Sequence, residues 1–155
     1  MGLEIERKFI IDKLPFDLSS YDYHEIEQGY LTRNPVVRIR KEDDTYYLTY
    51  KSKGRLIKEE YNLPLTKEAY EELLPKISGN LIKKRRYLIP YNQELTIEFD
   101  VFKGMFKGLM LAEVEFSSEK EANSFVPPEW FGRDVTYTGE YQNSKLSLMN
   151  EFTIN

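Results

Sequence analysis

Three charged residues near the start of the chain, Glu4, Glu6 and Lys8, have types and spacing that could form part of a binding site. Side chains two residues apart on a β-strand point to the same face of the sheet. Two carboxylates and an ammonium on one face are unsuited to an apolar core and unusual on a solvent face. They suit half of a site for a metal ion and a polyanion, because carboxylates bind hard cations and ammonium groups bind phosphate oxygens.

The same spacing recurs in later segments that favour strands. The acidic members of this charged face are Glu4, Glu6, Glu60, Glu98, Asp100, Glu113 and Glu115. The basic members are Lys8, Arg38, Arg40, Lys51, Lys53, Lys58, Lys84 and Arg86. Any single pair could belong to an ordinary solvated sheet face. Because the pattern repeats in strand after strand, we favour a sheet closed into a barrel, with a charged lumen and apolar groups facing outward. Such a lumen must be balanced in charge and either wet or filled by ligand.

The elements that must position these residues follow from hydrophobic alternation and turn signals. After the opening strand, which Lys13-Leu14-Pro15 breaks, strands are expected over residues 25–32, 36–41, 45–53, 57–63, 83–90, 95–102 and 109–116. Thr66 should cap a helix that ends by a C-cap at Gly79, residues 118–121 form a capping box, and Asn143 should cap a last helix. The fold class is therefore α+β: an eight-stranded antiparallel β-barrel, or tunnel, with a few short helices outside.

Composition limits the chemistry. The 155 residues suffice for one domain with a core, and the net charge of −4 gives no general attraction to nucleic acid. Cysteine is absent and His24 is the only histidine, so a metal would need oxygen ligands, which indicates Mg²⁺, Mn²⁺ or Ca²⁺. The sequence has no apolar run of the ~20 residues that span a bilayer, and its charged beginning does not resemble a signal peptide. We expect a cytoplasmic protein with no nucleic-acid or membrane partner.

A lumen that carries both clustered cations and clustered carboxylates suits a metal-bound polyphosphate. Arginine and lysine would hold the phosphates, and the carboxylates would hold one or two metal ions. Lys83-Lys84-Arg85-Arg86 could also be a nucleic-acid patch, but strand alternation would divide these residues between two faces.

These paired motifs, in this order, resemble the CYTH superfamily, the triphosphate tunnel metalloenzymes, over nearly the whole chain. Gln28-Gly29-Tyr30-Leu31 and Tyr141-x-Asn143 also resemble segments of its small bacterial members. The resemblance implies a single tunnel domain over residues 1–155 that hydrolyses a terminal phosphoanhydride with Mg²⁺ or Mn²⁺. It implies phosphate binding by Lys8, Arg38, Arg40, Lys51, Lys53, Lys84 and Arg86. It implies metal ligation by Glu4, Glu6, Glu98, Asp100, Glu113 and Glu115.

The predicted catalytic residues are Lys8, Tyr30 and Glu60. Lys8 would polarise the terminal phosphate, and Tyr30 resembles a tyrosine that accepts a proton in some members. A phenol with a pKa near ~10 is a poor base at neutral pH, so a carboxylate or the metal is chemically easier. One position departs from the family pattern, because Asn62 stands where a further inward carboxylate is expected.

The favoured substrate is inorganic tripolyphosphate, and the chain could act as a homodimer. Three alternatives remain open: a nucleoside or thiamine triphosphatase, a class IV-type adenylate cyclase, and a non-catalytic polyphosphate-binding module. The full set of carboxylates argues against the last, because an anion-binding module gains nothing from acidic neighbours.

Overall fold

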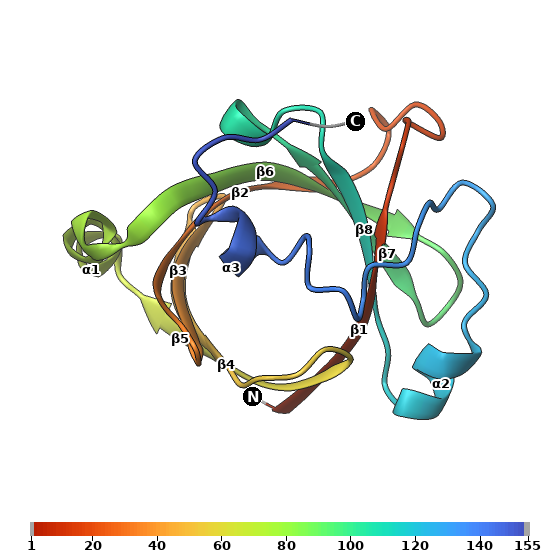
Figure 1. Ribbon diagram of the computed structural model, residues 1–155, viewed down its shortest axis with the longest axis horizontal. Coiled ribbons are helices and arrows are strands. Elements are labelled where there is room, and N and C mark those ends of the chain that lie inside the picture. Colours follow the sequence, from red (N-terminus) through yellow and green to blue (C-terminus); the bar gives the residue numbers. More distant parts are fainter. Residues whose placement is uncertain (1, 154–155) are drawn as a thin grey trace.

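A computed structural model describes residues 2–153 and shows a closed antiparallel β-barrel (Figure 1). Its strands are β1 (Gly2–Ile10), β2 (Tyr23–Arg33), β3 (Val36–Glu42), β4 (Thr45–Lys51), β5 (Ile57–Leu65), β6 (Ser78–Pro90), β7 (Thr96–Phe102) and β8 (Met110–Glu115). Around the barrel they follow the order β1-β5-β4-β3-β2-β6-β7-β8, and β8 pairs with β1 to close it. The predicted eight-stranded antiparallel barrel is thereby confirmed.

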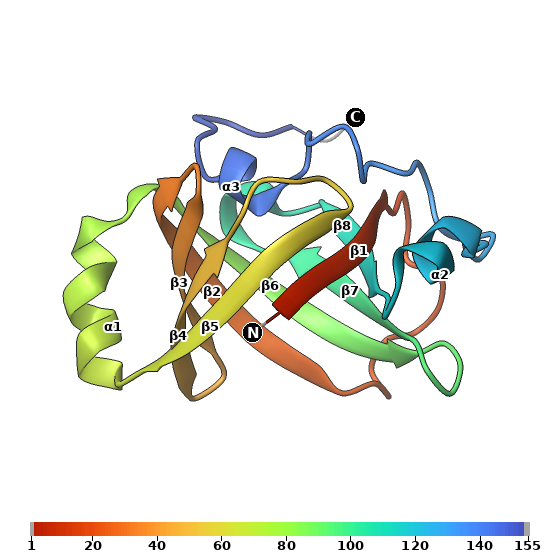
Figure 2. The same ribbon diagram turned by 90° about the horizontal axis from the view of Figure 1, so that it is seen from below.

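Strand alternation divides the side chains between lumen and exterior as expected. Glu4, Glu6 and Lys8 face the lumen, whereas Ile5 and Phe9, on the same strand, are buried in an apolar cluster on the outside. This outer cluster continues over β7 and β8 and contacts α2 (Glu119–Ser124) and the segment that follows it (Figure 2). The apolar core of this barrel therefore lies mostly around it, which leaves the lumen available for polar groups.

Two element boundaries differ from the sequence expectation. Strand β4 ends at Lys51, so Lys53 lies in the following loop and is exposed. Thr66 caps α1 (Lys67–Leu73) as predicted, and Pro75 lies in the short 3-10 helix η1 (Leu74–Lys76) that follows it. Gly79 does not cap a helix, because β6 already begins at Ser78. Its φ of +79° and the closeness of the Ser147 carbonyl explain why a glycine stands there.

One end of the lumen is apolar, which the sequence analysis did not anticipate. Ile82, Phe102, Leu109 and Leu111 continue the inward-facing rows and form a buried cluster with Phe106. Leu146 of the terminal helix α3 (Asn143–Leu146) joins this cluster, and α3 lies at the barrel mouth (Figure 1). Strand alternation could have predicted this apolar end. Phe102 stands two residues after Asp100, and Leu111 stands two residues before Glu113, so each shares a face with its charged neighbour.

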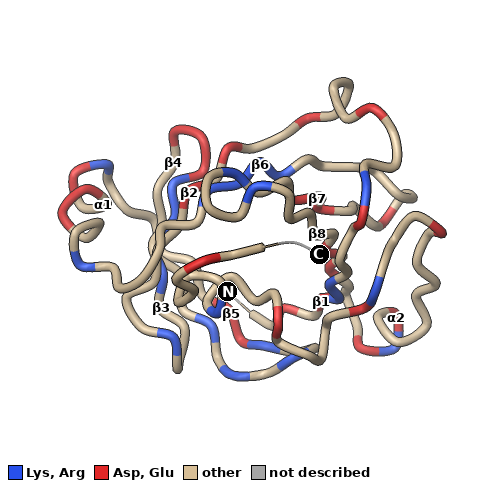
Figure 3. Tube along the Cα trace, turned by 45° about the horizontal axis from the view of Figure 1, so that its top comes forward, with Lys and Arg blue, Asp and Glu red and all other residues tan. Residues whose placement is uncertain are grey.

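None of the helices in residues 2–153 has the length and apolar character needed to cross a bilayer. Charged residues of both signs are spread over the strands and loops (Figure 3).

Candidate active site

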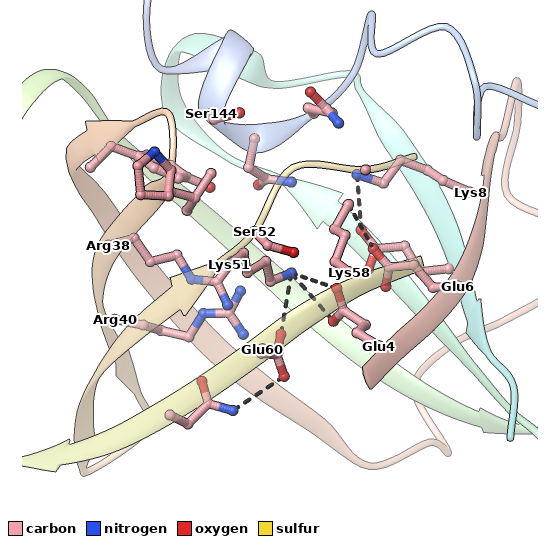
Figure 4. A pocket seen from close by; sticks show the side chains of 18 of the residues that line it. Glu4, Glu6, Lys8, Arg38, Arg40, Lys51, Ser52, Lys58, Glu60 and Ser144 are labelled. Atoms are coloured by element: carbon pink, nitrogen blue, oxygen red, sulfur yellow. Dashed lines mark hydrogen bonds and ion pairs between the residues drawn. The ribbon is translucent and has the colours of Figure 1, made fainter. Parts of the chain in front are cut away.

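The lumen holds a cavity of about 660 Å³ lined by charged side chains from most of the strands (Figure 4). The predicted site residues among its lining are Glu4, Glu6, Lys8, Tyr30, Arg38, Arg40, Lys51, Lys53, Glu60, Lys84, Arg86, Glu98, Glu113 and Glu115. The strands therefore bring residues from the whole length of the chain to one space. Asp100 is the one predicted site residue that does not line it.

Strand β3 forms a basic wall. Arg38 and Arg40 are both buried, and their guanidinium groups reach into the cavity. Arg40 Nε donates to Gln28 Oε1 at 2.8 Å, and its Nη1 lies 3.3 Å from the Tyr47 hydroxyl. Within residues 2–153, Arg38 has no carboxylate partner, and its buried Nε makes no hydrogen bond. A buried guanidinium without a counter-ion is costly, so Arg38 is a strong candidate for binding an anion.

Strands β7, β8 and β1 form an acidic wall on the other side. Glu98 lies opposite Glu113 in the β7–β8 register, and Glu6 lies opposite Glu115 in the β1–β8 register. Burial raises the pKa of Glu6 to about 7, and the carboxylates of Glu113 and Glu4 act in the same direction. Burial and neighbouring carboxylates also raise the pKa of Glu98 and of Glu115. By contrast, although burial opposes the ionisation of Glu113, the cations Lys8 and Arg86 lower its pKa well below its usual range, so the carboxyls of this wall differ in how readily they ionise.

Three lysines of the cavity lining pair with its carboxylates. Lys51 Nζ lies 3.0 Å from Glu4 Oε1 and 3.3 Å from Glu60 Oε2. Lys8 Nζ lies 3.4 Å from Glu113 Oε1, and Lys58 Nζ lies 3.9 Å from Glu6 Oε1. These ammonium groups pair with carboxylates but still line the cavity. An entering polyanion could therefore replace the carboxylates as their partners.

Two further cations are held more firmly. Arg86 donates to both oxygens of Asp100, at 2.7 and 2.9 Å, and lies 3.3 Å from both Glu98 and Glu113. Lys84 Nζ lies 2.7 Å from the other side of the same carboxylate, at Asp100 Oδ2. Asp100 is completely buried and engaged by these two cations. Its geometry fits a residue that holds Lys84 and Arg86 in place better than a metal ligand.

Tyr30 and Glu60 occupy different parts of the cavity lining. Tyr30 is buried on β2, and its hydroxyl accepts a hydrogen bond from Gln28 Nε2 at 3.1 Å. Asn62 Nδ2 donates to Glu60 Oε1 at 3.2 Å. Asn62 therefore orients the Glu60 carboxylate but does not supply the further negative charge expected at its position. Burial opposes the ionisation of Glu60, but the hydrogen bond shared with Glu4 and the charge of Lys51 outweigh it and lower the pKa of Glu60 to about 2.

The acidic wall fits a hard divalent cation. Its donors are carboxylate oxygens, the ligands that hard cations prefer, and a bound cation would favour the ionised form of Glu6, Glu98 and Glu115, whose pKa values burial raises. Within residues 2–153, no three carboxylates meet closely enough to form a ready-made metal cage. A metal ion would therefore have to take part of its coordination from substrate oxygens and water.

Several lining residues were not assigned by sequence reasoning. Lys58 was placed on the charged face but given no role, although its position two residues before Glu60 carried the signal. Gln28 and Tyr47, which hold Arg40, follow the same inward rows. Arg55 and Asn143 come from loops and a helix end, where no strand period could identify them. His24 Nδ1 lies 2.6 Å from Asp43 Oδ2, outside the cavity lining.

The fold and the cavity define a class of protein: a closed antiparallel β-tunnel whose lumen has one basic and one acidic wall. Residues 2–152 match the CYTH domain, and the chain belongs to this family.

Two similar proteins are named inorganic triphosphatase. One, from Nitrosomonas europaea, is 38% identical over 150 residues, which cover 94% of this chain and 97% of the relative. The other, from Acetivibrio thermocellus, is 35% identical over 157 residues and covers 94% of each chain. A crystal structure of an inorganic triphosphatase superimposes with a TM-score of 0.72 at 35% identity, over 98% of this chain and 99% of that one.

Proposed function

We propose that this protein is an inorganic triphosphatase, which hydrolyses the terminal phosphoanhydride of tripolyphosphate to pyrophosphate and phosphate with Mg²⁺ or Mn²⁺. The observation that carries the proposal is the buried guanidinium of Arg38, whose Nε makes no hydrogen bond, beside Arg40 and facing a wall of carboxylates across one cavity. A polyanion satisfies the first wall and a divalent cation the second. The relatives that carry this name support the same activity.

The phosphates would lie along the basic wall. Arg38 and Arg40 offer guanidinium groups for phosphate oxygens, and Lys8, Lys51 and Lys58 can exchange their carboxylates for phosphates. That exchange would release Glu113, Glu4 and Glu6 at the moment a cation arrives with the substrate. Lys84 and Arg86, which Asp100 orients, would complete the phosphate contacts.

A metal ion would be held by one or two carboxylates of the set Glu4, Glu6, Glu98, Glu113 and Glu115, together with substrate phosphates, and when bound it would neutralise charge on the phosphate oxygens. Lys8, beside Glu113, would stabilise the charge that develops on the terminal phosphoryl group during in-line attack by water. Glu60, held ionised by Lys51 and Asn62, is suited to orienting that water. A carboxylate that the metal does not engage would accept the proton more easily than a phenol such as that of Tyr30.

Lys53 has a different proposed part. It is exposed in the β4–β5 loop at the rim of the cavity, so it would attract the entering polyanion more than grip a bound phosphate. The cytoplasmic location and a homodimer remain predictions.

The test is phosphate release by the purified protein with Mg²⁺, Mn²⁺ or EDTA. Tripolyphosphate, ATP, thiamine triphosphate and pyrophosphate would be compared as substrates. We expect metal-dependent release from tripolyphosphate far above that from ATP. Preference for ATP or thiamine triphosphate would assign the corresponding triphosphatase, and pyrophosphate release from ATP with formation of a cyclic nucleotide would assign a cyclase. Binding of tripolyphosphate without release from any substrate would assign a binding module.

A further inference from the structure

Lys84 is the most deeply buried cation of the cavity, with 1% of its surface exposed. Its Nζ lies 2.7 Å from Asp100 Oδ2 and donates to Asn143 Oδ1 at 3.2 Å. The ring of Phe102 lies 5.4 Å from the same nitrogen. An ammonium group has three hydrogens, and these two oxygens occupy two of them. Since Lys84 lines the cavity, the remaining hydrogen is the one available to a ligand.

Asn143 comes from outside the barrel wall. It is the first residue of α3, where the sequence suggested a helix cap, but the N-cap position belongs to Gln142 and no side chain caps this helix. Asn143 is 8% exposed and lines the cavity. Lysine can only donate hydrogen bonds, so the contact with Lys84 assigns the amide oxygen of Asn143 to this bond. Its side chain therefore contacts a residue of the lumen and does not cap the helix.

Contacts other than those of the Asn143 side chain hold α3 in place. Arg33 Nε donates to the Ser144 carbonyl at 3.3 Å and to Ser147 Oγ at 3.1 Å. The backbone nitrogen of Asn80 donates to the Ser147 carbonyl at 2.6 Å. Figure 4 shows α3 and Ser144 above the charged side chains of the cavity. Because these bonds fix the backbone of α3, Asn143 is not needed to attach the helix to the barrel.

We propose that Asn143 is a positioning residue: with Asp100, it holds the Lys84 ammonium so that one N–H is directed into the cavity toward a phosphate of the substrate. This inference rests on the proposed function, because it assigns Lys84 a phosphate ligand. It makes the C-terminal helix a contributor to the binding site of a barrel whose other phosphate contacts come from strands.

A double-mutant cycle on tripolyphosphate binding tests the proposal. Binding would be measured by isothermal titration calorimetry in EDTA, where metal and turnover do not contribute, for the wild-type protein, Asn143→Leu, Lys84→Met and the double variant. We expect Asn143→Leu to weaken binding about tenfold, the size expected for a lost hydrogen bond to a charged group. In the Lys84→Met background the same change should alter binding less than about twofold, because Asn143 would have no ammonium left to position.

Ser147→Ala is the matched control, since it removes a contact of Arg33 with the C-cap of α3, and Ser147 itself does not line the cavity. It should lower the thermal midpoint while leaving tripolyphosphate affinity within about twofold of wild type. An equal loss of affinity in Ser147→Ala would overturn the proposal, as would an Asn143→Leu effect that persists in full without Lys84. If wild-type protein neither binds tripolyphosphate in EDTA nor releases phosphate from it with Mg²⁺ or Mn²⁺, the proposed function fails first. If wild type binds and Asn143→Leu binds equally well, only the present inference fails.

Discussion

At the scale of single residues, replacing Lys8 should affect activity but not stability. Its ammonium lies 3.4 Å from Glu113, but Arg86 also contacts that carboxylate, so removing Lys8 does not leave Glu113 without a cation. We predict that Lys8→Ala lowers kcat for phosphate release by at least about a thousandfold, in line with the loss of a transition-state contact. Its thermal midpoint should stay within a few degrees of wild type. Lys83→Ala, on the exposed face of β6, is the control. Similar rates in the two variants would refute this role.

A second residue-scale prediction concerns pH. The folded protein raises the pKa of Glu6 from 4.5 to about 7, so folding favours the protonated carboxyl. The unfolded chain ionises first as pH rises, and Glu6 therefore reduces stability progressively between about pH 4.5 and pH 7. Urea unfolding should show Glu6→Gln gaining on wild type by up to about 3 kcal/mol across this window, and no further above it. Stability curves that run parallel would contradict the assignment.

At the scale of elements, Arg7 fastens α2 to β1. It donates to the carbonyls of Ala122 and Phe125 at 3.1 and 3.0 Å, and it pairs with Asp134 at 3.0 Å. Arg7→Met should lower the free energy of unfolding by about 2 kcal/mol. Because Arg7 faces outward, kcat/KM should not change. Arg133→Met, which breaks an exposed pair with Glu140, should cost less than about 0.5 kcal/mol. Equal losses of stability in both variants would show that the contacts of Arg7 stabilise the fold no more than an exposed ion pair does.

The elements also show where sequence reasoning succeeds. A period of two fixes the face of every strand residue, so the inward set, including Glu4, Arg38 and Glu113, could be predicted once closure was assumed. Distances across the lumen depend on strand register and tilt, which the period does not determine. That is why Asp100, on the right face, lies behind Arg86 and Lys84, and why Lys53 falls beyond the end of its strand. Asn143 had no period-of-two pattern to identify it, because it stands at the start of α3 and not on a strand.

At the scale of the whole molecule, closure of the barrel reverses the usual arrangement of a domain. Apolar side chains such as Phe9 and Phe99 form the core outside the sheet, under α2 and the segment after it. The interior is left to charges, except for the cluster around Phe102 and Leu111 at the end where α3 lies. A lumen of this kind offers groups of both signs in one cavity, which is what the proposed metal–polyphosphate substrate requires. The CYTH match over residues 2–152 extends along the same strands that build the cavity.

The most direct test of the central claim is a crystal structure of the protein grown with tripolyphosphate in EDTA. The account predicts three phosphate groups inside the barrel along the basic wall, with the Arg38 guanidinium bonded to phosphate oxygens and at least one of Lys8 and Lys51 drawn from its carboxylate. Phosphate density confined to the outer surface, with Arg38 still unpaired, would contradict the account.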